Sequence, residues 1–222
     1  MGTISVNKLG GLALMAAPVI TLIFFFLQPG GTFVDAADPS DAGATIKAMV
    51  SNAGLGKVTS MLIPIGLLVF LYGIFVLQGN VRSNGNGDAL SRIGAQFILV
   101  GVIGWVLVSG AVLAITGSDL PAEQAVSVFE SIYSATVGIG TISGIISGIG
   151  FLALALALST RDDYNKIFAL VAAAAAVVAI VVGIISAIDT AQLQTMNLIT
   201  GITYLVHMAW FFTLGRSLSQ SE

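Results

Sequence analysis

The chain has 222 residues, of which 56% are hydrophobic and only 9% are charged, and its formal net charge is −3. Soluble domains carry about 25% charged residues, so most of this surface must face lipid instead of water. The chain has no cysteine and one histidine, which excludes disulfides, thiolate chemistry, iron–sulfur clusters and His-rich metal sites. We expect no metal, no cofactor and, without a basic stripe, no nucleic acid partner.

Six apolar stretches are long enough to cross a bilayer core of about 30 Å, which takes roughly 20 helical residues. They span residues 9–27, 58–77, 93–115, 135–158, 167–188 and 197–214. Backbone groups in lipid must pair internally, and none of these stretches alternates with a period of two, so helices are expected and barrel strands are not. The sequence predicts an all-α, polytopic bundle of six transmembrane helices in a single domain over residues 1–222.

The first stretch could be mistaken for a signal peptide, because small residues near Ala36 offer a cleavage site. Its apolar run is long for that role, so we expect a membrane helix that is retained.

Lysine and arginine set the expected orientation, because loops that carry them stay cytoplasmic. An N-terminus inside the cell leaves two of these residues outside, Lys47 and Lys57, and places six inside: Lys8, Arg82, Arg92, Arg161, Lys166 and Arg216. The sequence therefore predicts a multi-pass protein of the cell inner (plasma) membrane with both termini cytoplasmic and the lipid bilayer as its first partner.

Three loops carry further expectations. In residues 28–57, a cap-like Asp38-Pro39 followed by Ala, Ile, Met and Val up to Gly54 predicts a short amphipathic helix on the outer surface, as a connector over the helix ends or as a lid or docking surface. In the loop 117–134, the segment from Pro121 should extend the fourth helix outward. The turn 82–88 is rich in Gly and Asn but lacks the Lys-Ser/Thr of a phosphate loop.

The fourth stretch contains the most regular pattern, GIGTISGIISGIG. Gly140, Gly144 and Gly148 recur every four residues, with Ser143 and Ser147 beside them, which places a smooth groove on one helix face. Close backbone contact drives helix association in lipid, so these five residues are predicted to pack against a neighbour. The fifth stretch, rich in alanine, is the expected partner; a homo-oligomer contact, another subunit or a permeation path are the alternatives.

The sixth stretch contains the single histidine. Asn197, Thr200, Tyr204 and His207 are spaced to share one face, with Thr203 alongside. Polar residues at membrane depth usually face the bundle interior and are candidate sites. Three interpretations of His207 are open. It is a packing residue whose ring is hydrogen-bonded to a serine, a tyrosine or a backbone carbonyl; or it is a substrate or proton site; or it is a haem or metal ligand. Ser186, Tyr72 and Gln96 are its candidate partners by depth.

The overall plan resembles the DUF4386-type family of uncharacterised prokaryotic membrane proteins. The resemblance rests on NKLGGLALMAAPVI, on GKVTSMLIPIGLLVFLYGIFV and on LSRIGAQFILVGVIGWVL, and it covers the topology of the whole chain without a sharp motif. It implies a six-helix plan with an extended first external loop, and no catalytic residues.

Three functions remain open. An accessory or scaffolding subunit of a membrane complex fits the glycine face and the lack of intramembrane charge, and it is the leading hypothesis, with other membrane subunits or a second copy as partner. A small channel or transporter for a neutral or weakly polar solute fits the polar stripe of the sixth helix, although no internal repeat accompanies it. An intramembrane enzyme would have to be centred on His207, and an enzyme is the less expected outcome.

Overall fold

The computed structural model describes residues 4–83 and 86–220, and every regular element in these ranges is a helix. The elements are α1 (Val6–Phe26), α2 (Ala42–Ser51), α3 (Ala53–Ser83), α4 (Asp88–Gly117), α5 (Ala122–Ser159), α6 (Lys166–Ile188), a 3-10 turn (Thr190–Gln192) and α7 (Leu193–Gln220). Six of them, all except α2 and the 3-10 turn, are long and apolar enough to span a membrane. The predicted all-α polytopic membrane fold is confirmed.

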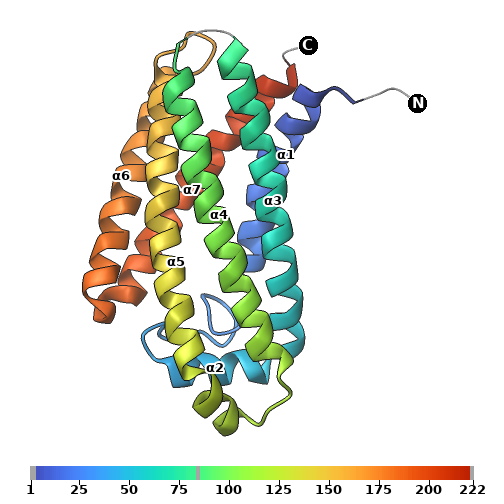
Figure 1. Ribbon diagram of the computed structural model, residues 1–222, viewed down its shortest axis with the longest axis vertical. Helices are drawn as coiled ribbons and strands as arrows, with labels where there is room; N and C mark the ends of the chain where they lie inside the picture. The colour runs from blue at the N-terminus through green and yellow to red at the C-terminus, as the bar shows by residue number, and fades with distance from the viewer. Residues whose placement is uncertain (1–3, 84–85, 221–222) are drawn as a thin grey trace.

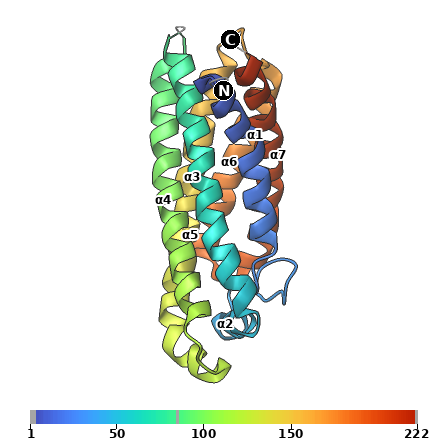
Figure 2. The ribbon, with the colours of Figure 1, turned by 90° about the vertical axis from the view of Figure 1, so that its right-hand side faces the viewer.

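The six long helices close a ring whose order follows the chain: α1, α3, α4, α5, α6, α7 and back to α1. Figures 1 and 2 show the long helices running side by side, with both termini at one end and α2 across the opposite end. We call these the termini end and the α2 end. The six basic residues that the sequence predicts inside the cell lie at the termini end, and Lys47 and Lys57 lie at the α2 end.

The helices are longer than the apolar stretches that predicted them. With 38 residues, α5 is about 57 Å long, nearly twice the thickness of a bilayer core. Its first turns, which begin at Ala122, extend past the other helices at the α2 end, as the sequence predicted. Hydropathy identifies only the part of a helix that lies in lipid, so it gives the spans but not the full helices.

The first loop contains the predicted short helix, α2, but its boundaries differ from the prediction. The side chain of Asp41, not Asp38, caps α2 by accepting a hydrogen bond from the Ala44 N–H at 2.8 Å. Asp38 instead accepts from the N–H and the hydroxyl of Ser40. Gly54 does not end the helix either; it lies in the first turn of α3.

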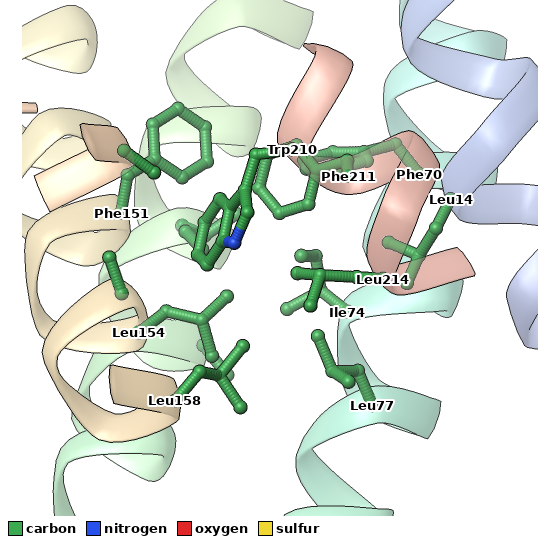
Figure 3. Close-up of a cluster of buried hydrophobic side chains, with 14 of the residues drawn as sticks. Leu14, Phe70, Ile74, Leu77, Phe151, Leu154, Leu158, Trp210, Phe211 and Leu214 are labelled. Carbon is green, nitrogen blue, oxygen red and sulfur yellow. The ribbon is translucent and has the colours of Figure 1, made fainter. Parts of the chain in front are cut away.

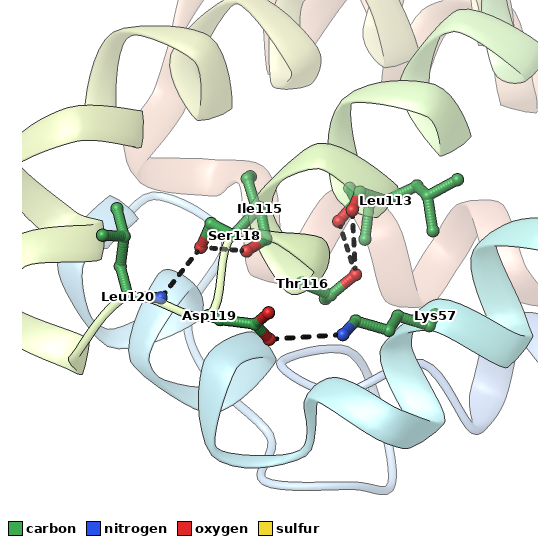
Figure 4. Close-up of polar contacts among 8 residues, drawn as sticks. Lys57, Leu113, Ile115, Thr116, Ser118, Asp119 and Leu120 are labelled. Atoms are coloured by element: carbon green, nitrogen blue, oxygen red, sulfur yellow. Dashed lines mark hydrogen bonds and ion pairs between the residues drawn. The ribbon is translucent and has the colours of Figure 1, made fainter.

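The apolar face of α2 packs on the ends of α4 and α5 instead of lying flat on lipid. Ile46 is fully buried there, and the Tyr133 hydroxyl on α5 donates to the Pro39 carbonyl at 3.0 Å. This small second core is fixed by contacts at the end of α4 (Figure 4), where the Lys57 ammonium of α3 lies 3.5 Å from the Asp119 carboxylate. Residues 28–51 are therefore a structured cover over the helix ends.

Large side chains fill the ring toward the termini end (Figure 3). The core there includes aliphatic and aromatic residues from four helices: Leu14, Phe70, Ile74, Leu77, Phe151, Leu154, Leu158, Trp210, Phe211 and Leu214. Such burial inside lipid gains little from the hydrophobic effect, so shape complementarity holds the helices together.

A buried arginine ties the loops of the termini end together. Arg161, which follows α5, is 7% exposed. Its Nη1 donates to the backbone carbonyls of Val81 at 3.3 Å and Asn86 at 3.2 Å, and its Nη2 pairs with the Asp163 carboxylate. The Val81 carbonyl belongs to the last turn of α3, so this arginine also caps that helix. The predicted flexible turn 82–88 contains residues 84 and 85, which lie outside the described residues.

Candidate functional site

The predicted glycine face is divided among three neighbouring helices of the same chain. A methyl group built on Gly148 would lie 2.9 Å from the Ile180 side chain of α6, which makes this the point where α5 and α6 approach closely. Gly140 instead faces Trp105 of α4, and Gly144 faces the Tyr204 hydroxyl of α7. The glycines are thus interior positions, turned toward the neighbours and the centre of the ring.

The most extensive helix pair is α4 with α5, and it depends on glycines that the sequence analysis did not single out. A methyl group on Gly94 of α4 would meet the Gly150 carbonyl at 2.8 Å, and one on Gly101 would overlap the Ser147 hydroxyl. Gly104 lies equally close to Ser143. The two serines therefore pack against α4, and the seven-residue spacing of Gly94 and Gly101 was the signal that could have found this interface.

The polar stripe of the sixth spanning helix, α7, divides along its length. Asn197 is exposed and Thr200 is half-buried, whereas Thr203 and His207 are buried. Tyr204 and His207 are brought together on the wall of a partly open cavity, and Asn197 and Thr200 are not part of it.

The imidazole of His207 is held by backbone oxygens. Its Nδ1 lies 2.7 Å from the Thr203 carbonyl of its own helix, and its Nε2 lies 3.1 Å from the Ala172 carbonyl of α6. The ring also lies against Phe151 of α5, with centroids 4.8 Å apart. Because both nitrogens face carbonyl oxygens, His207 presents a ring surface to the cavity rather than a free nitrogen. The partners suggested by depth, Ser186, Tyr72 and Gln96, are not the ones that hold it.

The cavity, which we call the central cavity, has a volume of about 140 Å³ and lies at the centre of the ring. Its walls come from α1, α3, α4, α5 and α7 and are mainly apolar. The rings of Phe70, Phe151 and Phe211 form its floor toward the termini end, with Phe70 and Phe211 4.8 Å apart. On the other side Phe25 of α1 and Trp105 of α4 meet edge to face at 6.4 Å.

Three residues with a hydroxyl side chain, from three different helices, line this apolar cavity: Thr21 of α1, Ser147 of α5 and Tyr204 of α7. The Thr21 and Ser147 oxygens lie at the helix contacts, against Gly66 of α3 and Gly101 of α4. Within residues 4–83 and 86–220, none of the three has a hydrogen-bond partner, and the Thr21 oxygen is fully buried. Serine and threonine in membrane helices commonly satisfy their hydroxyls on the preceding turn, as Thr136 and Ser143 do on α5. The hydroxyls of Thr21, Ser147 and Tyr204 stand out because they lack this bond.

The arrangement can bind but offers little for acid–base chemistry. The part of the chain that the structure describes contains no group of three His, Asp or Glu side chains that could hold a metal ion. Thr21 and Ser147 were missed by the sequence analysis because isolated hydroxyls in apolar helices carry no pattern. The chain matches no protein-family model, no curated protein and no solved structure, so the resemblance to the DUF4386-type family stays a prediction.

Proposed function

We propose that this membrane protein binds a small, uncharged and mainly apolar molecule in the central cavity, as the solute site of a small transporter or channel. The observation that carries the proposal is the apolar cavity itself, beside which the hydroxyls of Thr21, Ser147 and Tyr204 have no hydrogen-bond partner among the described residues. Ligand sites typically combine apolar walls with a few convergent polar groups. A hydroxyl left without a partner in an apolar interior costs free energy, and a bound molecule with an oxygen would recover it.

The volume of the cavity limits the ligand. An apolar cavity of about 150 Å³ accommodates a molecule the size of benzene, so a central cavity of about 140 Å³ suits a ligand of that size. A charged ligand is disfavoured, because none of the residues around the cavity is a carboxylate, a lysine or an arginine. The expected ligand therefore has a compact apolar body and one hydroxyl or carbonyl group.

Binding is tested with cyclohexanol as the probe. In a Trp210→Phe background, Trp105 on the cavity wall is the remaining tryptophan, so its fluorescence reports occupancy in detergent. Tyr204→Phe keeps the shape of the cavity but removes one hydroxyl, and a neutral hydrogen bond is worth about 1 kcal/mol. We expect roughly fivefold weaker binding, and Leu67→Phe, which fills the cavity, should abolish it.

The matched control is Tyr72→Phe, which removes the hydroxyl of an exposed tyrosine on α3. Equal affinities in Tyr204→Phe and Tyr72→Phe, together with unchanged binding in Leu67→Phe, would place the probe outside the cavity and overturn the proposal. Transport is measured separately, because cyclohexanol crosses bilayers unaided. Liposomes that contain the protein should swell faster in propionamide, which has a small apolar body and one amide group, than liposomes with Leu67→Phe.

The orientation is part of the same proposal. The termini end carries six lysines and arginines and the α2 end carries two, so the positive-inside rule places the termini in the cytoplasm of a cell with this protein in its plasma membrane. The aromatic floor then closes the cavity toward the cytoplasm. Labelling of a cysteine introduced at Asp162 or at Glu123 in whole cells, with an impermeant reagent, tests this; only the Glu123→Cys variant should react.

The accessory-subunit hypothesis stays a prediction with less support from the geometry. Gly140, Gly144 and Gly148 face α4, α7 and α6 of the same chain, so a partner subunit or a second copy would need another surface. Native mass spectrometry after gentle extraction tests it, because a subunit would retain its partner at a fixed stoichiometry. The hypothesis of an enzyme centred on His207 likewise stays a prediction.

A further inference from the structure

A second, separate groove lies on the lipid-facing side of α3 and α4 near the termini end. Its volume is about 240 Å³, and its polar lining comes from four side chains: Gln78, Arg82, Arg92 and Gln96. Each helix contributes one glutamine and one arginine, four residues apart. Because α3 and α4 are antiparallel neighbours, the two arginines lie at the rim, and the two glutamines lie four residues, about 6 Å, deeper.

The polar groups of this groove are unequally satisfied. Arg92 pairs with Asp88 through two contacts, at 2.9 and 2.8 Å. Among the described residues, Arg82 makes no ion pair or hydrogen bond, although its charge acts on Asp88, and neither glutamine has a hydrogen-bond partner. Unpaired amides near the hydrocarbon region are costly, so Gln78 and Gln96 indicate an oxygen-rich ligand at that depth.

The order of chemistry along the groove matches that of a phospholipid. The rim has two guanidinium groups and one carboxylate, a net charge of +1, which suits one phosphate monoanion. Guanidinium groups bind phosphate oxygens with paired hydrogen bonds. Below them lie the two amides, at the level of ester carbonyls, and then the exposed ring of Phe75, at the level of the first methylene groups.

We propose that this groove binds the headgroup of an anionic phospholipid such as phosphatidylglycerol. The phosphate lies on Arg82 and Arg92, the ester carbonyls accept from Gln78 and Gln96, and an acyl chain runs along Phe75. A zwitterionic headgroup is less suitable, because its ammonium group would approach the unpaired Arg82. The groove and the central cavity share no lining residue, so the two proposals stand or fall independently.

The experiment is native mass spectrometry of the protein released from nanodiscs with equal amounts of phosphatidylglycerol and phosphatidylcholine. We expect the wild-type chain to retain more phosphatidylglycerol than phosphatidylcholine. In the double variant Arg82→Gln/Gln96→Leu, the ratio of the two retained lipids should be about ten-fold lower. The matched control is Arg216→Gln, which removes an exposed positive charge at the same end and leaves the groove intact. Arg82→Lys keeps the charge but not the paired hydrogen bonds, and we expect an intermediate loss.

Two outcomes would overturn the proposal. An equal loss of preference in the groove variant and in Arg216→Gln would mean that surface charge alone attracts the lipid. Full displacement of the lipid by millimolar inorganic phosphate, together with unchanged lipid retention when Gln96 alone is changed to Leu, would show a site for free phosphate instead of a lipid headgroup. Gel filtration of each variant confirms folding, and Arg82→Lys keeps the test decisive if the double variant does not fold.

Discussion

The His207 imidazole of α7 lies tilted against the Phe151 ring of α5, with centroids 4.8 Å apart and planes inclined by 33°. The same imidazole contacts a carbonyl oxygen of α6. One side chain thus connects three helices at the edge of the central cavity.

We expect His207→Leu to destabilise the protein by about 1 kcal/mol, because it keeps an apolar body of similar size but loses the contact with the Ala172 carbonyl. His207→Ala should cost more, about 2–4 kcal/mol, because it also enlarges the cavity. Thermal unfolding in detergent measures both. Asn197→Leu, an exposed polar-to-apolar change on the same helix, is the control and should stay within about 0.5 kcal/mol; equal effects at both positions would contradict a structural role for His207.

The α4–α5 interface should not tolerate a methyl group at Gly94. The added carbon would lie 2.8 Å from the Gly150 carbonyl and 2.9 Å from the Leu154 nitrogen, and backbone atoms cannot move aside individually. Gly94→Ala should therefore lower stability by about 1–3 kcal/mol, seen as a lower melting temperature. Gly110→Ala is the control on the same helix, where a methyl group meets open space. A normal melting temperature for Gly94→Ala would show that the helices can separate without cost.

The buried guanidinium of Arg161 should be irreplaceable by lysine. Its donation to the Val81 and Asn86 carbonyls needs a planar, branched donor group, and a lysine ammonium offers a single point of charge. Arg161→Lys and Arg161→Gln should each cost about 1–3 kcal/mol, because buried carbonyls lose their partner. Arg216→Gln provides the exposed comparison. If Arg161→Lys unfolds at the wild-type temperature, the guanidinium geometry is dispensable.

Asp38 provides a prediction about pH. The backbone N–H of Ser40 and then its hydroxyl donate to the Asp38 carboxylate, and these bonds hold the pKa of Asp38 below its ordinary value of 3.8. The ionised form stabilises the turn before α2, so that contribution is complete at pH values above 3.8 and is lost as the pH falls through the lowered pKa. A carbon-13 titration of the Asp38 carboxyl should give a midpoint below 3.8. Ser40→Ala removes the hydroxyl bond, so it should raise the pKa of Asp38 part of the way back to 3.8. A midpoint at 3.8 in the unmodified chain would contradict the bonds.

The apolar runs of the sequence were sufficient to predict six spanning helices, because lipid demands length and hydrophobicity that few other structures need. The start of α3 at Ala53 could not be predicted in the same way. Residues 53–57 contain two glycines and a lysine, which suggest a turn, yet the helix begins there because Gly56 packs closely on Thr116 of α4. That contact joins residues that are far apart in the chain.

The candidate site was only partly predictable for a similar reason. Helical spacing correctly placed Tyr204 and His207 on one face, but α7 crosses the ring obliquely (Figure 1), so the same face leaves the centre near Thr200. Thr21 and Ser147 come to line the same cavity as Tyr204 only after the ring closes. The sequence contains the polar groups, and the order of the helices around the ring decides which of them meet.

That order also sets the sequence in which the protein can be assembled in the membrane. Each spanning helix packs on the one synthesised just before it, so helical hairpins can form one after another as the chain is inserted. The pairing of α1 with α7 is different, because the first helix must wait for the last, and the two then meet where Gly11 lies against Gly215. Since α1 and α7 both contribute to the central cavity, a nascent chain has no complete cavity until that final seam has formed.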